Sequence, residues 1–233
     1  NAGITIGNIV GSNILNILII LGITAVITNV AIQKSTLLYE IPFMIGITAL
    51  LLVFGLTGSS ITFIEGVVFL LLFIAFLVYL FIMSKKGEVQ EEGEIKDIPV
   101  WKCLLFMVIG GVMVVKGSDF AVDGATEIAR YFGMSERFIG LTIVAFGTSL
   151  PELVTSVTAA RRGNADIAIG NIVGSNIFNI LFVIGTTALI CDVPFDQKFV
   201  TDTLVAIFSG VLLWVGTIRY KELRKKCGIV MLV

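Results

Sequence analysis

The chain has 233 residues, of which 57% are hydrophobic and only 14% are charged, and its formal net charge is −1. Soluble domains carry about 25% charged residues, so this composition excludes an ordinary soluble protein and predicts an integral membrane protein. The three cysteines lie far apart, without the spacing of a disulfide framework or a zinc site. The sequence has no histidine, so the usual side chain of a proton relay near neutral pH is missing.

The apolar runs predict an all-α integral membrane protein, because about 20 apolar residues are needed to cross a bilayer as a helix. Seven full spans and part of an eighth are expected, at Ile4–Val30, Leu37–Leu56, Ile61–Met83, Val100–Ala129, Arg137–Ala160, Ile167–Cys191, Phe199–Ile218 and from Cys227 onward. We expect three parts, namely the remainder of a first half (1–83), an acidic loop (84–99) and a second half (100–233). Both ends are expected to be cut from a longer transporter.

Lysine and arginine residues are distributed unequally between the two sides that these spans define. Alternate loops place twelve of them on one side and three on the other, with Lys116 inside a span. Cytoplasmic loops carry an excess of Lys and Arg, so the side with twelve is predicted to be cytoplasmic. The acidic loop 84–99 then lies in the cytoplasm of a multi-pass protein of the plasma or inner membrane.

The chain contains a repeat. Residues 1–27 read NAGITIGNIVGSNILNILIILGITAVI and residues 164–190 read NADIAIGNIVGSNIFNILFVIGTTALI, and 19 of these 27 positions are identical. Two spans this similar in one chain indicate a duplication. Four predicted spans separate them, so the two copies cross the membrane in opposite directions. This inverted-topology repeat is typical of secondary transporters, whose binding sites lie near the bilayer midplane between the repeats.

Each copy carries polar residues at positions i, i+4 and i+8, a spacing that keeps them on one stripe of a helix. They are Asn8, Ser12 and Asn16 in the first copy and Asn171, Ser175 and Asn179 in the second. One interpretation is that they hold helices together, and it stays open for the outer residues Asn8 and Asn171. We interpret the four inner residues, which are duplicated and near mid-membrane, as ion ligands. The Gly-xxx-Gly pairs of the copies, Gly7 with Gly11 and Gly170 with Gly174, are expected to allow close approach of another helix.

A second polar motif, GTSLPE at residues 147–152, interrupts the apolar run from Phe138 to Ala160. A carboxylate at bilayer depth costs roughly 2.5–3.5 kcal/mol on insertion scales, so Glu152 marks a functional site by default. Pro151 removes a helix hydrogen bond, which predicts a broken helix whose freed carbonyls line a cavity. Thr148 and Ser149 lie four and three residues before Glu152 and can share its face. All these ligands are oxygens, which suit Na⁺ and Ca²⁺.

Three charged residues, Lys116, Asp119 and Asp123, lie inside the predicted span Val100–Ala129. We interpret them as an internal ion pair with a polar outer end of the helix. The alternative is that they line the access path of an ion, which would make Asp119 a secondary site residue.

These motifs resemble a known family. GTSLPE at 147–152, GNIVGSNIFN at 170–179, GNIVGSNILN at 7–16 and KGSDF at 116–120 are similar to the repeats of prokaryotic-type sodium/calcium exchangers of the cation/calcium antiporter superfamily. The resemblance implies ten spans in two inverted halves, with this chain starting at the third. It also implies a second GTSLPE-type glutamate before Asn1. The ion ligands that it implies are Glu152, Ser149, Thr148, the Ala145 carbonyl, Ser175, Asn179, Ser12 and Asn16.

The function implied by this resemblance is secondary active transport, the exchange of Na⁺ for Ca²⁺ by alternating access, and not enzyme catalysis. Glu152, Asn179 and Asn16 would contact the metal ion, and no cofactor is expected beyond the transported ions. The expected partner is the lipid bilayer, without nucleic acid or an obligate protein partner. A proton-coupled antiporter is the alternative, although neither Asn-rich motif contains the glutamate usual in that branch, and a cation channel is a further one.

Overall fold

The computed structural model of the chain describes residues 2–85, 99–135, 139, 143, 145–147 and 149–233. The chain divides into two compact units. The first unit comprises Asn1–Ala75 and Thr155–Val233, and the second comprises Phe76–Val154. Each unit is described separately.

The first copy of the repeat begins with one long helix that contains a π-helical segment. It consists of α1 (Ala2–Leu15), the π-helical η1 (Asn16–Leu21) and α2 (Gly22–Ile27). A short strand, β1 (Val30–Ala31), leads into the second span, formed by η2 (Thr36–Glu40) and α3 (Ile41–Gly58). Strand β2 (Ser60–Ile61) then precedes helix α4 (Phe63–Lys85), which continues into the second unit.

The second copy repeats this order of elements. Helix α9 (Ala165–Phe178), the π-helical η4 (Asn179–Ile184) and α10 (Gly185–Ile190) again form one long helix. They are followed by β3 (Val193–Pro194), α11 (Gln197–Ile218), β4 (Glu222–Leu223) and α12 (Lys225–Leu232). The boundaries of α1, η1 and α2 recur 163 residues later in α9, η4 and α10. The 19 identities of the sequence repeat are therefore matched by identical local structure.

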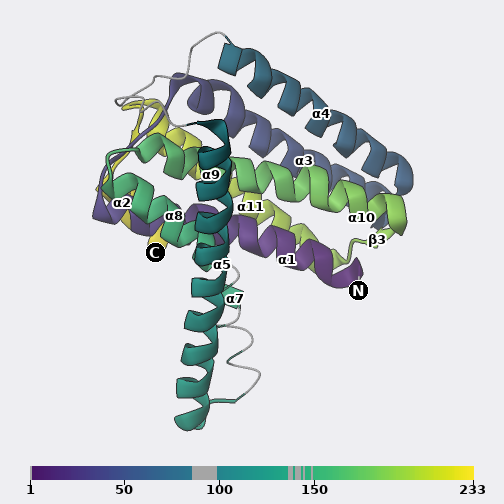
Figure 1. Cartoon of the computed structure of the whole chain (residues 1–233). Helices are drawn as coiled ribbons and strands as arrows, with labels where there is room; N and C mark the ends of the chain where they lie inside the picture. The colour runs from purple at the N-terminus through teal and green to yellow at the C-terminus, as the bar shows by residue number, and fades with distance from the viewer. Residues whose placement is uncertain (1, 86–98, 136–138, 140–142, 144, 148) are drawn as a thin grey trace. The chain divides into compact units, whose positions relative to one another are not determined.

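The two copies run in opposite directions, as the inverted repeat predicts. Figure 1 shows the chain passing from the N-terminus through α1 to α2 in one direction and from α9 to α10 in the other. Two antiparallel ribbons form, and in each of them a strand of the first half pairs with a strand of the second half. β1 pairs with β4 through Val30 and Leu223, and β2 pairs with β3 through Ile61 and Val193.

Two residues with left-handed backbone make the turns into these ribbons. Ser59 has a φ of 56° and Lys221 a φ of 53°, and each follows the end of a span, α3 or α11. The main-chain oxygen of Ser59 accepts from the Phe195 N–H at 2.9 Å, and that of Lys221 accepts from the Ile32 N–H at 3.0 Å. A left-handed residue at a helix C-terminus turns the chain out of the helix. The equivalent turns place the two ribbons at opposite ends of the first unit.

Glycines allow close helix contacts between α2 and α12 and between α4 and α10. A Cβ added at Gly228 would lie 2.8 Å from the Ala25 Cβ, and one at Gly66 would lie 2.8 Å from the Ala188 Cβ. The glycines that were expected to let a helix approach are different. A Cβ at Gly11, Gly170 or Gly174 meets no described atom within 4 Å, and only Gly7 has a neighbour, the Phe199 ring at 3.1 Å.

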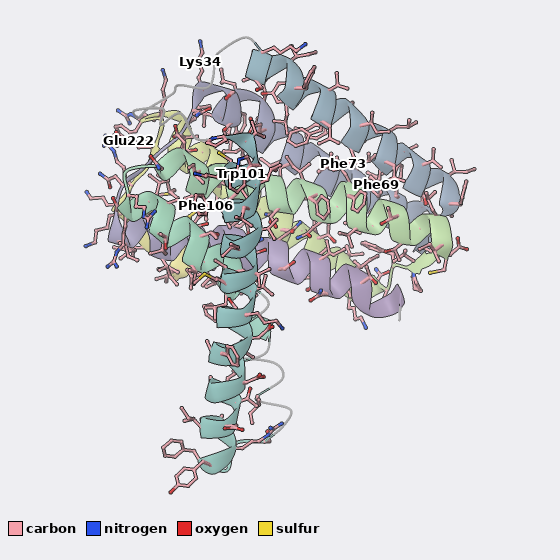
Figure 2. The ribbon with its side chains drawn as sticks, in the orientation of Figure 1. Lys34, Phe69, Phe73, Trp101, Phe106 and Glu222 are labelled. Carbon is pink, nitrogen blue, oxygen red and sulfur yellow. The ribbon has the colours of Figure 1, made fainter. Side chains whose placement is uncertain are left out.

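Aromatic side chains distinguish the buried from the exposed surface of the long helices. Phe69 of α4 is fully buried, and one turn later Phe73 packs against Phe178 and Phe182, with ring centroids 5.8 and 5.4 Å away (Figure 2). Trp101 and Phe106, by contrast, project from their helix and are exposed (Figure 2).

The second unit contains the longest helix of the described chain, α5 (Val100–Tyr131), and the short α7 (Ala145–Gly147). The 32 residues of α5 correspond to a helix about 48 Å long, which exceeds the roughly 30 Å thickness of the hydrocarbon core of a bilayer. Helix α8 (Leu150–Arg161) begins in this unit and ends in the first. Gly147 packs tightly against α5, because a Cβ there would overlap the Val122 Cγ2.

Six helices of the described residues are long and apolar enough to span a membrane. They are Thr5–Ile27, Thr36–Gly58, Phe63–Lys85, Val100–Tyr131, Asp166–Ile190 and Gln197–Ile218. These agree closely with six of the seven predicted full spans. The predicted span Arg137–Ala160 falls partly outside the described residues, as does the acidic loop 84–99, and α12 lies where the eighth span was predicted to begin.

Candidate functional site

In the first unit, the four inner candidate ligands occupy equivalent positions in the two copies of the repeat. Asn16 is the first residue of η1 and Asn179 is the first residue of η4, so each marks the point where an α-helix changes to a π-helical turn. Such turns occur frequently at functional sites. Ser12 and Ser175 lie one turn earlier and are half-buried, while Asn16 is 2% exposed.

Two asparagines that the sequence analysis did not single out, Asn13 and Asn176, join the copies. The Asn13 side-chain amide donates to the main-chain oxygen of Asn176 at 3.3 Å, and the Asn176 amide donates to the main-chain oxygen of Asn13 at 3.2 Å. Their side chains are 3% and 1% exposed. The reciprocal bonds are those expected where two repeats meet around a two-fold axis.

The candidate ligands Asn16 and Asn179 extend this set of bonds symmetrically. The Asn16 Nδ2 donates to the Asn176 Oδ1 at 2.9 Å, and the Asn179 Nδ2 donates to the Asn13 Oδ1 at 3.0 Å. The four asparagines, which we call the amide clasp, are therefore linked by four hydrogen bonds that all cross between the copies. Buried amides of this kind are stable only when their polar groups are satisfied.

The amide clasp leaves one buried oxygen atom, the Asn16 Oδ1, without a hydrogen bond from any described residue. An orphaned buried acceptor is costly, and a bound cation or water would compensate it. Amide oxygens are among the ligands that Na⁺ and Ca²⁺ prefer. The clasp thus presents an oxygen ligand at Asn16.

Hydroxyl groups satisfy the backbone around the π-helical turns. The Thr24 hydroxyl donates to the Ile20 oxygen and the Thr187 hydroxyl to the Val183 oxygen, both at 2.7 Å. Such bonds take up carbonyls that an irregular helix leaves open in a membrane. The Ser12 hydroxyl donates to the Ile9 oxygen at 3.0 Å, which leaves its oxygen able to act as an ion ligand.

The GTSLPE motif is divided between two helices of different length. α7 ends at Gly147 and α8 begins at Leu150, with Pro151 in its first turn, where a proline loses no intrahelical hydrogen bond. Ser149 is buried, and its main-chain oxygen accepts a hydrogen bond from the Leu153 N–H at 3.1 Å. The predicted break of the helix at this motif falls on Thr148, outside the described residues, and stays a prediction.

Glu152 lies in the first turn of α8, three residues after Ser149, and although the residue is only half-buried its carboxylate Oε2 is buried. The Ala145 carbonyl, a further candidate ligand, belongs to the first residue of α7. Thr148 lies outside the described residues. Among the described part of the chain, no group of three or more His, Cys, Asp or Glu residues could hold a metal ion. The candidate ligand set therefore depends mainly on amides, hydroxyls and carbonyls.

The secondary candidates lie in more exposed places. Asn8 is exposed, and the exposed Asn171 amide donates to the Thr155 hydroxyl at 3.3 Å. The Asp119 carboxylate lies 3.4 Å from the Lys116 ammonium, which confirms the predicted ion pair within the fourth span. Both side chains of this pair are more than half exposed, so it is not a buried pair.

Asn13 and Asn176 could have been found from the repeat itself. Both are asparagines at equivalent positions of the duplicated motif GSN, inside apolar runs. Neither belongs to the stripe at i, i+4 and i+8, because each lies one residue after the serine of that stripe.

Comparison with known proteins gives one consistent family. The sodium/calcium exchanger protein family matches residues 1–82 and 102–233. A putative antiporter, CaxA of Alkalimonas amylolytica, is 37% identical over 228 residues, covering 94% of this chain and 71% of that protein. The sodium/calcium exchanger MaX1 of Methanosarcina acetivorans is 43% identical over 112 residues, covering 48% of this chain and 32% of that protein.

A solved structure agrees with this result. The sodium-calcium exchanger NCX_Mj, soaked with zero Na⁺ and Ca²⁺, matches with a TM-score of 0.79 and 33% identity, covering 99% of this chain and 73% of that chain. The fold of the chain therefore agrees with the family that the sequence matches indicate. The chain belongs to the sodium/calcium exchanger family, whose members are membrane antiporters of cations.

Proposed function

We propose that this chain is the ion-binding part of a sodium/calcium antiporter, which exchanges Na⁺ for Ca²⁺ by alternating access. The observation that carries the proposal is the amide clasp. In it the Asn16 Oδ1, at the buried junction of α1 and η1, accepts no hydrogen bond from a described residue and can bind a cation. A site of oxygen ligands without thiolate or imidazole suits hard cations. No covalent chemistry is needed, because transport requires only that ions exchange on each side in turn.

The proposed ligands form two groups. The carboxylate of Glu152, the hydroxyls of Ser149 and Thr148 and the Ala145 carbonyl supply the charge and the backbone dipoles of the broken helix. The long helices of the two copies supply the uncharged ligands, namely Ser12, Asn16, Ser175 and Asn179. Both groups consist of oxygen ligands, which Ca²⁺ prefers. Asn8, Asn171 and Asp119 are proposed only as secondary residues outside this set.

We propose Na⁺ as the coupling ion rather than H⁺. The motifs at 7–16 and 170–179 contain amides and hydroxyls but no carboxylate. These groups do not titrate near neutral pH, so they cannot release a proton when Ca²⁺ binds. They can ligate Na⁺, whose binding requires oxygen atoms but no deprotonation.

We place the protein in the plasma or inner membrane with the segment 84–99 in the cytoplasm. The support is the unequal distribution of Lys and Arg between alternate loops. Lys34 lies just after β1 and the basic residues Arg219, Lys221, Arg224, Lys225 and Lys226 surround β4, so pairing of β1 with β4 gathers positive charge at one end of the first unit.

The test is uptake of Ca²⁺ into vesicles that contain the full-length protein, driven by an outward Na⁺ gradient. Glu152→Gln removes the charge of the proposed ligand, and we expect it to reduce the initial rate at least tenfold. A matched control is Glu127→Gln, which removes an exposed carboxylate of α5 and should leave the rate unchanged. Equal rates for the native protein and Glu152→Gln would contradict the assignment of this ligand.

The same vesicles separate the alternatives. A proton-coupled antiporter would take up Ca²⁺ when the Na⁺ gradient is replaced by a pH gradient. A channel would show a Ca²⁺ flux that depends on neither counter-ion. Either result would overturn the proposed Na⁺ coupling.

A further inference from the structure

We propose that Asn13 and Asn176 are positioning residues, which fix the direction in which Asn179 and Asn16 present their ligand oxygens. The proposal rests on the proposed function, because it concerns the geometry of the same ion site. Neither residue was a candidate ligand, and neither needs to touch an ion for this role.

The first step is the orientation of the two central amides. A main-chain carbonyl oxygen can only accept a hydrogen bond. The side chains of Asn13 and Asn176 face the carbonyl oxygens of the opposite copy at 3.3 and 3.2 Å, so each must turn its Nδ2 toward that oxygen. The oxygen and nitrogen of an amide are otherwise hard to tell apart, but here the backbone partner decides between them.

The second step transfers this orientation to the ligands. Once the Nδ2 of Asn13 is committed to the backbone, its Oδ1 can only accept, and it faces the Asn179 side chain at 3.0 Å. Asn179 must therefore turn its own Nδ2 inward, which leaves its Oδ1 as the remaining ligand atom. Asn176 acts in the same way on Asn16, at 2.9 Å. Through the central amides, the two main-chain carbonyl oxygens therefore fix the orientation of the Asn16 and Asn179 Oδ1 atoms.

The third step is that each copy of the repeat sets the orientation of the ligand in the other copy. Asn13 of the first copy orients the ligand of the second, and Asn176 of the second copy orients the ligand of the first. All of the central groups are buried, so water cannot easily replace a missing amide. If the central amide were lost, the ligand amide could rotate and present its N–H groups, which repel a cation.

The test is the KM for Ca²⁺ in Na⁺-driven uptake by the full-length protein in vesicles. Asn13→Ala removes the central amide, and Asn13→Leu replaces it with a side chain of similar volume. We expect each to raise the KM for Ca²⁺ about tenfold, while the maximal rate per folded molecule changes much less. The equivalent variants of Asn176 should behave alike, and they replace the Asn13 variants if those do not fold.

A matched control separates positioning from a loss of stability. Thr203→Val removes the hydroxyl of a fully buried side chain that bonds only within its own helix, to the Phe199 oxygen at 2.7 Å. It should lower the thermal stability without a change in the KM. A merely structural role of Asn13 would produce this same pattern, and that outcome would overturn the proposal.

A double-mutant cycle tests the direction of the coupling. Because Asn13 acts through Asn179, Asn13→Ala should raise the KM no further in a protein that already carries Asn179→Ala, whereas its effect should persist beside Asn16→Ala. Full additivity with Asn179→Ala would contradict the proposed path. If the native protein shows no Na⁺-dependent uptake, the proposed function fails instead. If it does transport but the Asn13 variants keep the native KM, only the positioning role fails.

Discussion

Asn13 and Asn176 exchange hydrogen bonds, each donating its side-chain amide to the main-chain oxygen of the other, at 3.3 and 3.2 Å. They occupy equivalent positions of the two copies, 163 residues apart. Reciprocal bonds between equivalent residues require a two-fold relation of the copies. This contact therefore links the sequence repeat to the place where two helices of opposite direction meet, at the junctions that carry Asn16 and Asn179.

The first prediction concerns a negative charge at Asn179. Asn179→Asp removes the N–H group that donates to the Asn13 Oδ1 at 3.0 Å and places two oxygens against each other. The Asn13 amide cannot turn to help, because its Nδ2 is bonded to the Asn176 carbonyl. We expect the variant to lose about 1–3 kcal/mol of stability in EDTA and to regain part of it with Ca²⁺, which would neutralise the carboxylate.

Thermal unfolding of the purified full-length protein in detergent, with EDTA and with excess Ca²⁺, measures this effect. Asn171→Asp is the control, since it makes the same substitution at the equivalent type of residue in an exposed position. An unfolding temperature of Asn179→Asp equal to that of the native protein in EDTA would contradict the prediction.

The sequence predicted the repeated half of the fold well, for a physical reason. Residues 1–27 and 164–190 share 19 of 27 positions, and identical sequences in equivalent surroundings form identical elements. The start of a helix at Leu150 is also consistent with the sequence, because Pro151 is favoured in the first turn of a helix. Six spans followed from apolar runs alone.

Other features could not be predicted because they depend on tertiary contacts. The strands have two residues each, too short for an alternating pattern, and β1 pairs with β4 from the other end of the chain. The amide clasp depends on where α1 and α9 meet, and a stripe at i, i+4 does not contain Asn13. The close glycine contacts were expected within the GNIVG motifs but occur at other glycines, among them Gly66 and Gly228.

The second prediction uses these two glycines. Gly66→Ala and Gly228→Ala would each place a Cβ 2.8 Å from an alanine Cβ, Ala188 or Ala25, and within 2.9 Å of a main-chain oxygen. Backbone atoms cannot move aside without separating the helices, so we expect each variant to lose about 1–3 kcal/mol of stability.

Thermal unfolding of the full-length protein compares them with Gly46→Ala, where an added Cβ meets no atom within 4 Å. The control should unfold at the native temperature or slightly above it, since alanine favours a helix over glycine. Similar losses at Gly66 and Gly228 are expected from the symmetry of the copies, and a loss at Gly46 equal to theirs would argue against close packing as the cause.

The third prediction is the orientation in the membrane. Lys34 lies beside the β1–β4 ribbon (Figure 2), and Lys198 lies in α11 just after β3 of the other ribbon. In a protein whose three cysteines are changed to serine, we expect Lys198→Cys to react on intact cells with a membrane-impermeant maleimide. Lys34→Cys should react only after permeabilisation, because basic ends of spans stay in the cytoplasm. The reverse pattern would invert the proposed topology.

The fourth prediction tests the packing that supports the GTSLPE motif. Gly147→Ala would bring a Cβ into overlap with the Val122 Cγ2 of α5, so the Val122 side chain, α5 or α7 must move. A shift of about 1 Å in ligand position is enough to weaken a site strongly, and we expect the rate of Na⁺-driven Ca²⁺ uptake to fall at least tenfold. Val122→Ala removes both Cγ atoms and should restore most of the rate in the double variant. Gly124→Ala on the same helix, where an added Cβ meets no atom within 4 Å, should leave the rate unchanged. If Val122→Ala gives no recovery, contact with this side chain is not what requires glycine at position 147.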